Sequence, residues 1–192
     1  YLYLRMILVL GVSLYTSRVL LQSLGVIDLG IYNLIGGIIA SLSFLNSSLA
    51  GASSRFITHA LGVGLVEKIR RYYATLQFLH IALALLFIFV TQIFAHYLVY
   101  TMLDIPPERA DTAFWLLQFF TVSAAVSIVS VPDSALIMAH ERMDLYAYIA
   151  IGEAGLRLLA VILISFLDVD RLLYFGLFTL GIQLLVNLSY AL

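Results

Sequence analysis

The chain has 192 residues, of which 63% are hydrophobic and 11% are charged, and its formal net charge is −1. Soluble domains carry roughly 25% charged residues, and so short a chain cannot hide this much apolar surface, so the composition excludes an ordinary soluble protein and predicts lipid as the solvent. The near-neutral charge argues against a nucleic-acid partner, and the lack of cysteine excludes disulfides and thiolate metal ligands.

Six stretches are long and apolar enough to cross a bilayer core as helices, which takes about 20 residues each. In chain order they cover residues 2–24, 29–54, 72–100, 112–139, 146–167 and 172–192. Short polar segments separate them, and they lack the alternation typical of membrane-barrel strands. The sequence therefore predicts an all-α membrane protein with six transmembrane helices. Because the sequence starts at Tyr1 and stops inside an apolar stretch, we expect it to be a piece of a longer protein.

The distribution of basic residues predicts the orientation of these helices. The second and fourth connections and the neighbouring helix end carry Lys68, Arg70, Arg71, Arg142 and Arg55. The other connections are rich in acidic residues, namely Asp28, Asp104, Glu108, Asp111, Asp168 and Asp170. Basic connections usually face the cytoplasm, so we expect the N-terminus to lie inside the cell.

Arg18 lies about two-thirds of the way along the first expected span, directly after Tyr15, Thr16 and Ser17. An arginine at mid-membrane costs roughly 2.5–3.5 kcal/mol on insertion scales, so it usually faces a cavity or a partner. Arg18 is either a cationic contact for an anionic substrate in a central cavity, or a side chain that snorkels to the headgroups. The sequence leaves both interpretations open.

The second expected span is dense in Gly, Ala and Ser and carries Asn46 in its middle. Small residues let helix backbones approach closely, and this close packing accounts for most of the Gly, Ala and Ser residues in the span. A helix this small and polar is a poor surface for lipid, so we expect it to be buried or to line a wet cavity, with Asn46 as a candidate cavity contact. Arg55 closes the stretch and either binds phosphate or marks the cytoplasmic boundary.

Pro132 falls late in the fourth expected span and is followed by Asp133. Proline removes a backbone donor and kinks helices, so Pro132 is a candidate hinge. Asp133 is either an ion or proton site, or an interfacial residue near the cytoplasmic end.

Glu153 and Arg157 are four residues apart in the fifth expected span, in the order that favours a helical ion pair. Pairing lowers the cost of both charges in the membrane. The pair is either purely structural, or Glu153 takes part in cation coupling while Arg157 contacts an anionic ligand.

Two blocks of sequence carry a family resemblance. In the first, residues 13–62, an Arg-containing turn leads to Leu24-Gly25 and then Gly30-Ile31-Tyr32, and a small-residue helix ends in Arg55-Phe56. The second is VPDSALIMAHERMDLYAYI, residues 131–149. Both blocks resemble bacterial polysaccharide and O-antigen flippases of the MOP (multidrug/oligosaccharidyl-lipid/polysaccharide exporter) superfamily. The family commonly has an aromatic residue and then Asn after this proline, and this chain departs from that pattern with Asp133-Ser134.

The resemblance implies a fold and a function. The chain would be the N-terminal lobe of a two-lobed transporter similar to the MATE family, in the bacterial inner membrane. It would flip undecaprenyl-diphosphate-linked oligosaccharides across that membrane by alternating access, for polysaccharide or O-antigen biosynthesis. Cavity arginines would hold the diphosphate. Arg18 and Arg55 both lie in the first quoted block, whereas Glu153 and Arg157 lie outside both blocks. The expected partners are the lipid-linked oligosaccharide, membrane lipids and other polysaccharide-assembly proteins; no cofactor is expected beyond coupling to H⁺ or Na⁺.

Two other functions compete with this one. A cation-coupled multidrug or metabolite antiporter shares the two-lobed design, but it would favour acidic and aromatic residues over arginine in the cavity. A membrane enzyme acting on the same lipid carrier would need a catalytic base on a long outer loop. The connections here run only to about ten residues, the length typical of helix bundles, and P-loop, zinc-site and Gly-x-Ser-x-Gly motifs are absent from the sequence. We therefore do not expect an enzyme.

Overall fold

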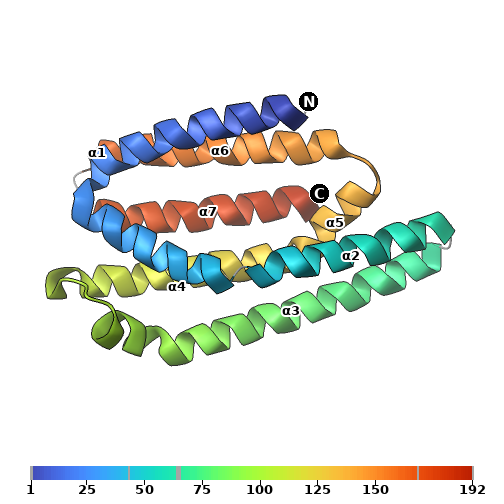
Figure 1. Cartoon of the computed structure of the whole chain (residues 1–192), viewed down its shortest axis with the longest axis horizontal. Coiled ribbons are helices and arrows are strands. Elements are labelled where there is room, and N and C mark those ends of the chain that lie inside the picture. The colour runs from blue at the N-terminus through green and yellow to red at the C-terminus, as the bar shows by residue number, and fades with distance from the viewer. Residues whose placement is uncertain (1, 43, 64–65, 168, 192) are drawn as a thin grey trace.

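The computed structural model describes residues 2–42, 44–63, 66–167 and 169–191, without the side chains of residues 2–5, 42, 44–48, 63, 66 and 191. Every regular element in this part of the chain is a helix, and the long helices run side by side along one axis (Figure 1). The prediction of an all-α architecture is confirmed for the described residues.

The first element, α1 (Leu2–Leu42), is two helices joined by a sharp bend at Gly25. Gly25 has φ 77° and ψ 178°, a backbone conformation open almost only to glycine because it has no Cβ. The bend sends the second arm, residues 26–42, back across the bundle from the first arm, residues 2–24 (Figure 1). The bend therefore lies in the connection expected between the first two spans.

The helices α2 (Phe44–Val63) and α3 (Val66–Tyr97) form a hairpin whose tip extends beyond the other helices (Figure 1). Ile57 of α2 and Leu76 of α3 are buried together against Ala135. The charged run 67–71, expected to be a connection, instead forms the first turns of α3. Its charged side chains are exposed, so this segment can be helical without burying a charge.

A π-helical turn η1 (Leu98–Met102) and a 3-10 turn η2 (Pro107–Arg109) lead into α4 (Ala110–Val129) and α5 (Val131–Ala139). The break between α4 and α5 lies at Ser130, and Pro132 occupies the first turn of α5. Proline has no N–H to continue the helical hydrogen bonds and fits the first turn of a new helix, which explains why α4 ends here. The structure thus places a helix break at the predicted proline; its role as a hinge stays a prediction.

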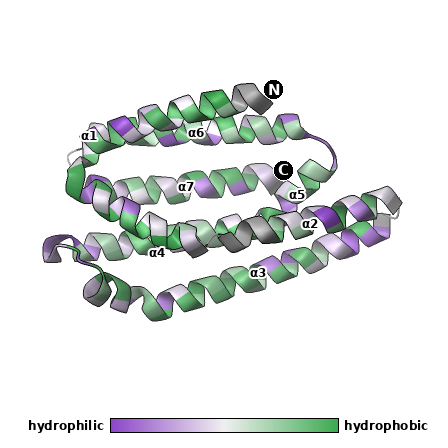
Figure 2. Ribbon diagram, viewed as in Figure 1, coloured by the Kyte–Doolittle hydropathy of each residue, from purple (hydrophilic) through white to green (hydrophobic). Residues whose placement is uncertain are grey.

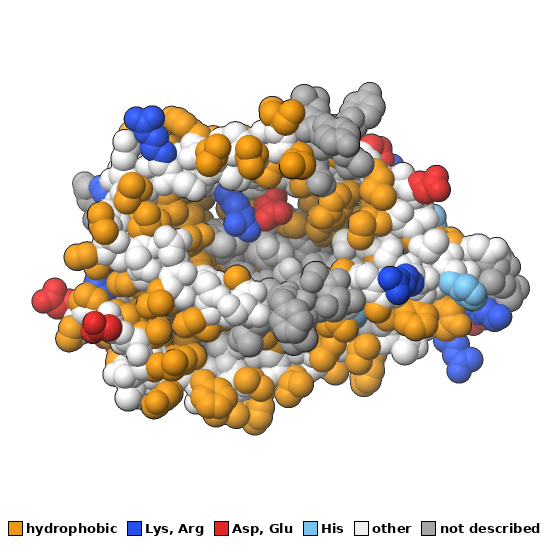
Figure 3. Space-filling model, viewed as in Figure 1, with side chains coloured by type: hydrophobic (Ala, Val, Ile, Leu, Met, Phe, Trp, Pro, Cys, Tyr) orange, Lys and Arg blue, Asp and Glu red, His pale blue; other side chains and the backbone are white. Residues whose placement is uncertain are grey.

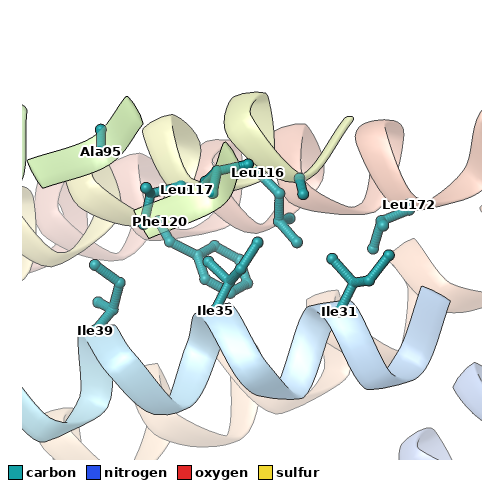
Figure 4. Packing of buried hydrophobic residues seen from close by; sticks show 10 residues of the cluster. Ile31, Ile35, Ile39, Ala95, Leu116, Leu117, Phe120 and Leu172 are labelled. Atoms are coloured by element: carbon teal, nitrogen blue, oxygen red, sulfur yellow. The ribbon is translucent and has the colours of Figure 1, made fainter. Parts of the chain in front are cut away.

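The last two helices, α6 (Met143–Ser165) and α7 (Arg171–Ala191), complete the bundle. α6 packs against the first arm of α1, and α7 packs against both α4 and α6. A Cβ on Gly176 of α7 would lie 2.7 Å from Leu116 Cδ1, so α7 and α4 meet closely at this glycine. The second arm of α1 inserts Ile31, Ile35 and Ile39 toward Leu116, Leu117 and Phe120 of α4 in the largest buried cluster (Figure 4).

Three connections meet at one end of the bundle. The Arg109 guanidinium pairs with Asp28 just after the α1 bend and with Asp170 just before α7, where Nη1 lies 3.0 Å from Oδ2. Arg171 Nη1 donates to the Ser23 carbonyl, 2.9 Å away at the end of the first α1 arm, where helix carbonyls lack partners. The predicted grouping of these connections on one side is confirmed, whereas the side of the membrane that they face stays a prediction.

Within the described residues, five helical stretches are long and apolar enough to cross a membrane, and the first of them, Met6–Ser41, contains the bend at Gly25. Figure 2 shows apolar residues along most of the helix lengths and polar residues gathered mainly at the two ends. The chain is therefore a multi-pass helical membrane protein. The second expected span, 29–54, divides between α1 and α2 and crosses residue 43, which lies outside the described part.

Candidate functional site

A cavity of about 250 Å³ with both polar and apolar lining residues lies between the two arms of α1, α6 and α7. The first α1 arm contributes Ser13, Thr16 and Ser17, and the second contributes Tyr32 and Asn33. Arg157 of α6 and the apolar side chains of Leu20 and Phe175 line it as well. The hollow is visible on the face of the molecule, with one basic and one acidic side chain inside it and mostly hydrophobic side chains around it (Figure 3).

Arg157 is held by an ion pair on its own helix. Its Nη2 donates to Glu153 Oε1 at 2.8 Å, one turn earlier on α6, so the predicted pairing is present. The Arg157 side chain is 44% exposed and that of Glu153 is 28% exposed, and the other guanidinium nitrogens make no hydrogen bond to a described residue. Arg157 therefore keeps donor groups available to the cavity.

The second arm of α1 is fixed at the cavity by aromatic packing. The ring of Tyr32 lies 5.4 Å from that of Phe120 in an edge-to-face arrangement, and 5.2 Å from that of Phe175. Such pairs add about 0.5–1.5 kcal/mol to burial, and they hold the arm between α4 and α7. This packing places Tyr32 and its neighbour Asn33 in the cavity wall.

Arg18 lies outside this cavity. Its side chain is exposed and is not among the cavity-lining residues, although its neighbour Ser17 is. Successive residues on a helix point about 100° apart, so when Ser17 faces the cavity Arg18 is turned away from it. The structure therefore shows no cavity contact that would support Arg18 as a contact for an anionic substrate.

The other candidate residues lie apart from the cavity. Arg55 is exposed on α2, in the hairpin formed with α3. Asn46 belongs to α2, but its side chain is outside the described residues. The structure therefore pairs Glu153 with Arg157, which lines the cavity, and it does not place Arg18 or Arg55 with them.

Asp133 belongs to the helix break at Ser130. It accepts a hydrogen bond from the Tyr73 hydroxyl of α3, and Gln77 Nε2 donates to the Val129 carbonyl at 3.3 Å. The Val129 carbonyl lies at the end of α4, where helix carbonyls lack intrahelical partners. Tyr73 and Gln77 thus brace the break from α3, and this polar cluster is separate from the Arg157 cavity.

Tyr32 and Asn33 were not among the site residues expected from the sequence, although Tyr32 belongs to the quoted Gly30-Ile31-Tyr32 motif. The sequence feature that could have identified them is their position soon after Gly25, because the bend there turns the second arm toward α6 and α7. Among the described residues, no group of three or more His, Asp or Glu side chains is arranged to hold a metal ion.

The comparisons with known proteins do not assign the chain to a family. No family model matches the sequence, and neither a curated protein nor a solved structure matches it.

Proposed function

We propose that the chain forms the cavity of a flippase that carries diphosphate-linked oligosaccharide lipids from one membrane leaflet to the other. The observation that carries this proposal is Arg157, a permanently charged side chain that lines a cavity together with hydroxyl and amide side chains, in a bundle that is otherwise mostly apolar. Charged residues are rare within transmembrane helices, and where they occur they usually mark a substrate or ion pathway.

The chemistry of the cavity matches the problem that such a lipid poses. Sugar hydroxyls would lose their hydrogen bonds to water in hydrocarbon, at a cost of several kcal/mol per group, and a diphosphate would lose its hydration as well. The serine, threonine, asparagine and tyrosine side chains of the cavity can replace water for the sugar. The planar guanidinium of Arg157 can donate two hydrogen bonds to one phosphate group.

A cavity open to only one leaflet moves nothing across the membrane. A second lobe, as in the two-lobed transporters that the sequence resembles, would rock against this one and expose the cavity to each side in turn. The lipid tail would stay in the bilayer and pass through the gap between lobes. The membrane is then the bacterial inner membrane, with the N-terminus in the cytoplasm.

A second candidate is an antiporter for organic cations. The rings of Tyr32 and Phe175 line the cavity, and Glu153 supplies a carboxylate one turn from it. Aromatic faces and a carboxylate attract cations. However, Glu153 is already neutralised by Arg157, whose own charge repels a cation, so this function is the less favoured one.

The test is complementation of a deletion strain with the full-length gene, with lipid-linked repeat units and surface polysaccharide as readouts. We expect Arg157→Gln to lower surface polysaccharide at least about tenfold and to raise the lipid-linked precursor, because the loss of a hydrogen bond to a charged group costs roughly 1.5–3 kcal/mol. Arg157→Lys should rescue partly, because the charge remains without the bidentate geometry.

Arg142→Gln is the matched control, since Arg142 is exposed and lies before α6 rather than at the cavity. Arg18→Ala in the same assay tests whether Arg18 contacts an anionic substrate or only extends to the headgroups. If Arg157→Gln supports normal surface polysaccharide at normal protein levels, the proposal is wrong. Sensitivity to organic cations in that deletion strain, with surface polysaccharide unchanged, would favour the antiporter instead.

A further inference from the structure

We propose that the cavity divides its ligand between two walls: the first arm of α1 accepts hydrogen bonds from sugar hydroxyls, and Arg157 of α6 donates to the phosphate. This inference rests on the proposed function and adds which residues contact the sugar. It follows from how the hydrogen-bonding groups of the cavity are already used within the protein.

The hydroxyl groups of Thr16 and Ser17 have no hydrogen left for a ligand. Thr16 Oγ1 donates to the Val12 carbonyl at 2.7 Å, and Ser17 Oγ donates to the Ser13 carbonyl at 3.0 Å. A hydroxyl group has a single hydrogen and two lone pairs that can accept. With the hydrogen committed to the backbone, each of these oxygens presents only acceptor sites to the cavity.

Asn33 on the second arm adds both kinds of group to the same region. Its side chain is exposed at the cavity and makes no hydrogen bond to another residue in the described part of the chain. An amide offers one carbonyl acceptor and two N–H donors, which matches a hydroxyl that both donates and accepts.

Arg157 on α6 has the reverse polarity. It lines the cavity, it has donors and no acceptor, and only Nη2 is bonded to a described residue. An ionised phosphate has acceptors only, so it is complementary to Arg157 and gains nothing from the committed hydroxyls of Thr16 and Ser17. A sugar hydroxyl can donate to Thr16 or Ser17, whereas a phosphate oxygen cannot.

A ligand that satisfies Thr16, Ser17 and Arg157 together must therefore carry an anionic group and neutral hydroxyl donors next to each other. A glycosyl phosphate has this arrangement, because its phosphate is attached directly to a ring rich in hydroxyl groups. Apolar side chains of the lining, among them Leu20 and Phe175, can contact the carbon skeleton of the ring. The structure thus assigns the sugar to α1 and the phosphate to α6.

Two probes of equal charge separate the roles of the walls: the dodecyl glucosyl and the dodecyl methyl diesters of phosphoric acid. Both carry one negative charge, and they differ only in the sugar. Their binding to the full-length protein in lipid nanodiscs would be measured by calorimetric titration, with empty nanodiscs as the blank. We expect the glucosyl diester to bind about three- to tenfold more tightly for each hydroxyl contact, the size of one hydrogen bond.

Thr16→Val keeps the shape of the side chain and removes its oxygen. We expect it to weaken the glucosyl diester by about three- to tenfold and to leave the methyl diester unchanged, and Ser17→Ala should do the same. Thr179→Val is the matched control, since Thr179 Oγ1 donates to a carbonyl of its own helix in the same way but does not line the cavity. Arg157→Gln should weaken both probes.

The possible failures are distinguishable. If the wild-type protein binds both diesters equally, or if Thr16→Val and Ser17→Ala weaken both equally, the assignment of the sugar to α1 is wrong while an anion site at Arg157 remains. If neither diester binds the wild-type protein, both this inference and the proposed function are wrong.

Discussion

Arg109 connects three parts of the chain at one end of the bundle, and its removal tests whether this end is held together by charge. In Arg109→Gln, Asp28 loses its guanidinium partner while its side chain is only 8% exposed. An unpaired charge in a fully buried position costs roughly 3–5 kcal/mol. Asp170 is 30% exposed and also accepts a hydrogen bond from Thr112 Oγ1 at 2.8 Å. Losing the Arg109–Asp170 ion pair therefore adds at most about 1 kcal/mol.

Arg109 is itself 34% exposed, so water can reach part of the position that it would vacate. We therefore reduce the expected cost of Arg109→Gln to about 2–3 kcal/mol in the free energy of unfolding. For a protein of this size, 1 kcal/mol corresponds to roughly 2–4 °C in Tm, so we expect a decrease of about 5–10 °C.

Thermal unfolding of the purified protein in detergent micelles measures this change. Arg142→Gln removes the same charge from an exposed position and should stay within about 0.5 kcal/mol of wild type. Adding Asp28→Asn to Arg109→Gln should restore part of the lost stability, because it removes the unpaired charge. A Tm for Arg109→Gln equal to that of Arg142→Gln would refute the reasoning, as would a double variant less stable than Arg109→Gln alone.

Two further variants test the bend and the helix break by thermal unfolding. Gly25→Ala should cost about 1–3 kcal/mol in the free energy of unfolding, because φ 77° is unfavourable for any residue with a Cβ. The control Gly30→Ala should be neutral or stabilising, because Gly30 has open space around it and no positive φ. Equal effects of the two variants would contradict the role of Gly25. Tyr73→Phe removes the hydroxyl that donates to the half-buried Asp133 and should cost about 1–2 kcal/mol, whereas Tyr72→Phe alters an exposed residue and should cost less than about 0.5 kcal/mol. No loss in Tyr73→Phe would show that Asp133 does not depend on this bond.

The helical class of the chain and the interruptions at Gly25 and Pro132 could be predicted because they depend on local sequence, whereas the second expected span, 29–54, divides between α1 and α2. Apolar length predicts a membrane helix, and Gly25 and Pro132 mark the positions where one helix must stop or bend. The i, i+4 spacing of Glu153 and Arg157 predicts their ion pair within a single helix. None of these predictions requires knowing which helix is the neighbour.

The cavity could not be predicted because it depends on how each helix is rotated about its axis. In a soluble helix the apolar stripe shows which face is inward, but a helix in lipid is apolar on most sides, so this signal is weak. Ser17 and Arg18 are adjacent in sequence, and only the rotation of α1 decides that Ser17 lines the cavity. Tyr32 and Asn33 reach the same cavity only because the chain reverses at Gly25.

The Glu153–Arg157 pair also affects how an anion is held at the proposed site. Only Nη2 of Arg157 is bonded to Glu153, so a phosphate can accept from the other guanidinium nitrogens and Glu153 keeps its partner when the anion binds. The ion pair therefore does not compete with the phosphate. The preference for a sugar joined to that phosphate rests instead on Thr16 and Ser17, whose hydroxyl hydrogens are already donated to backbone carbonyls.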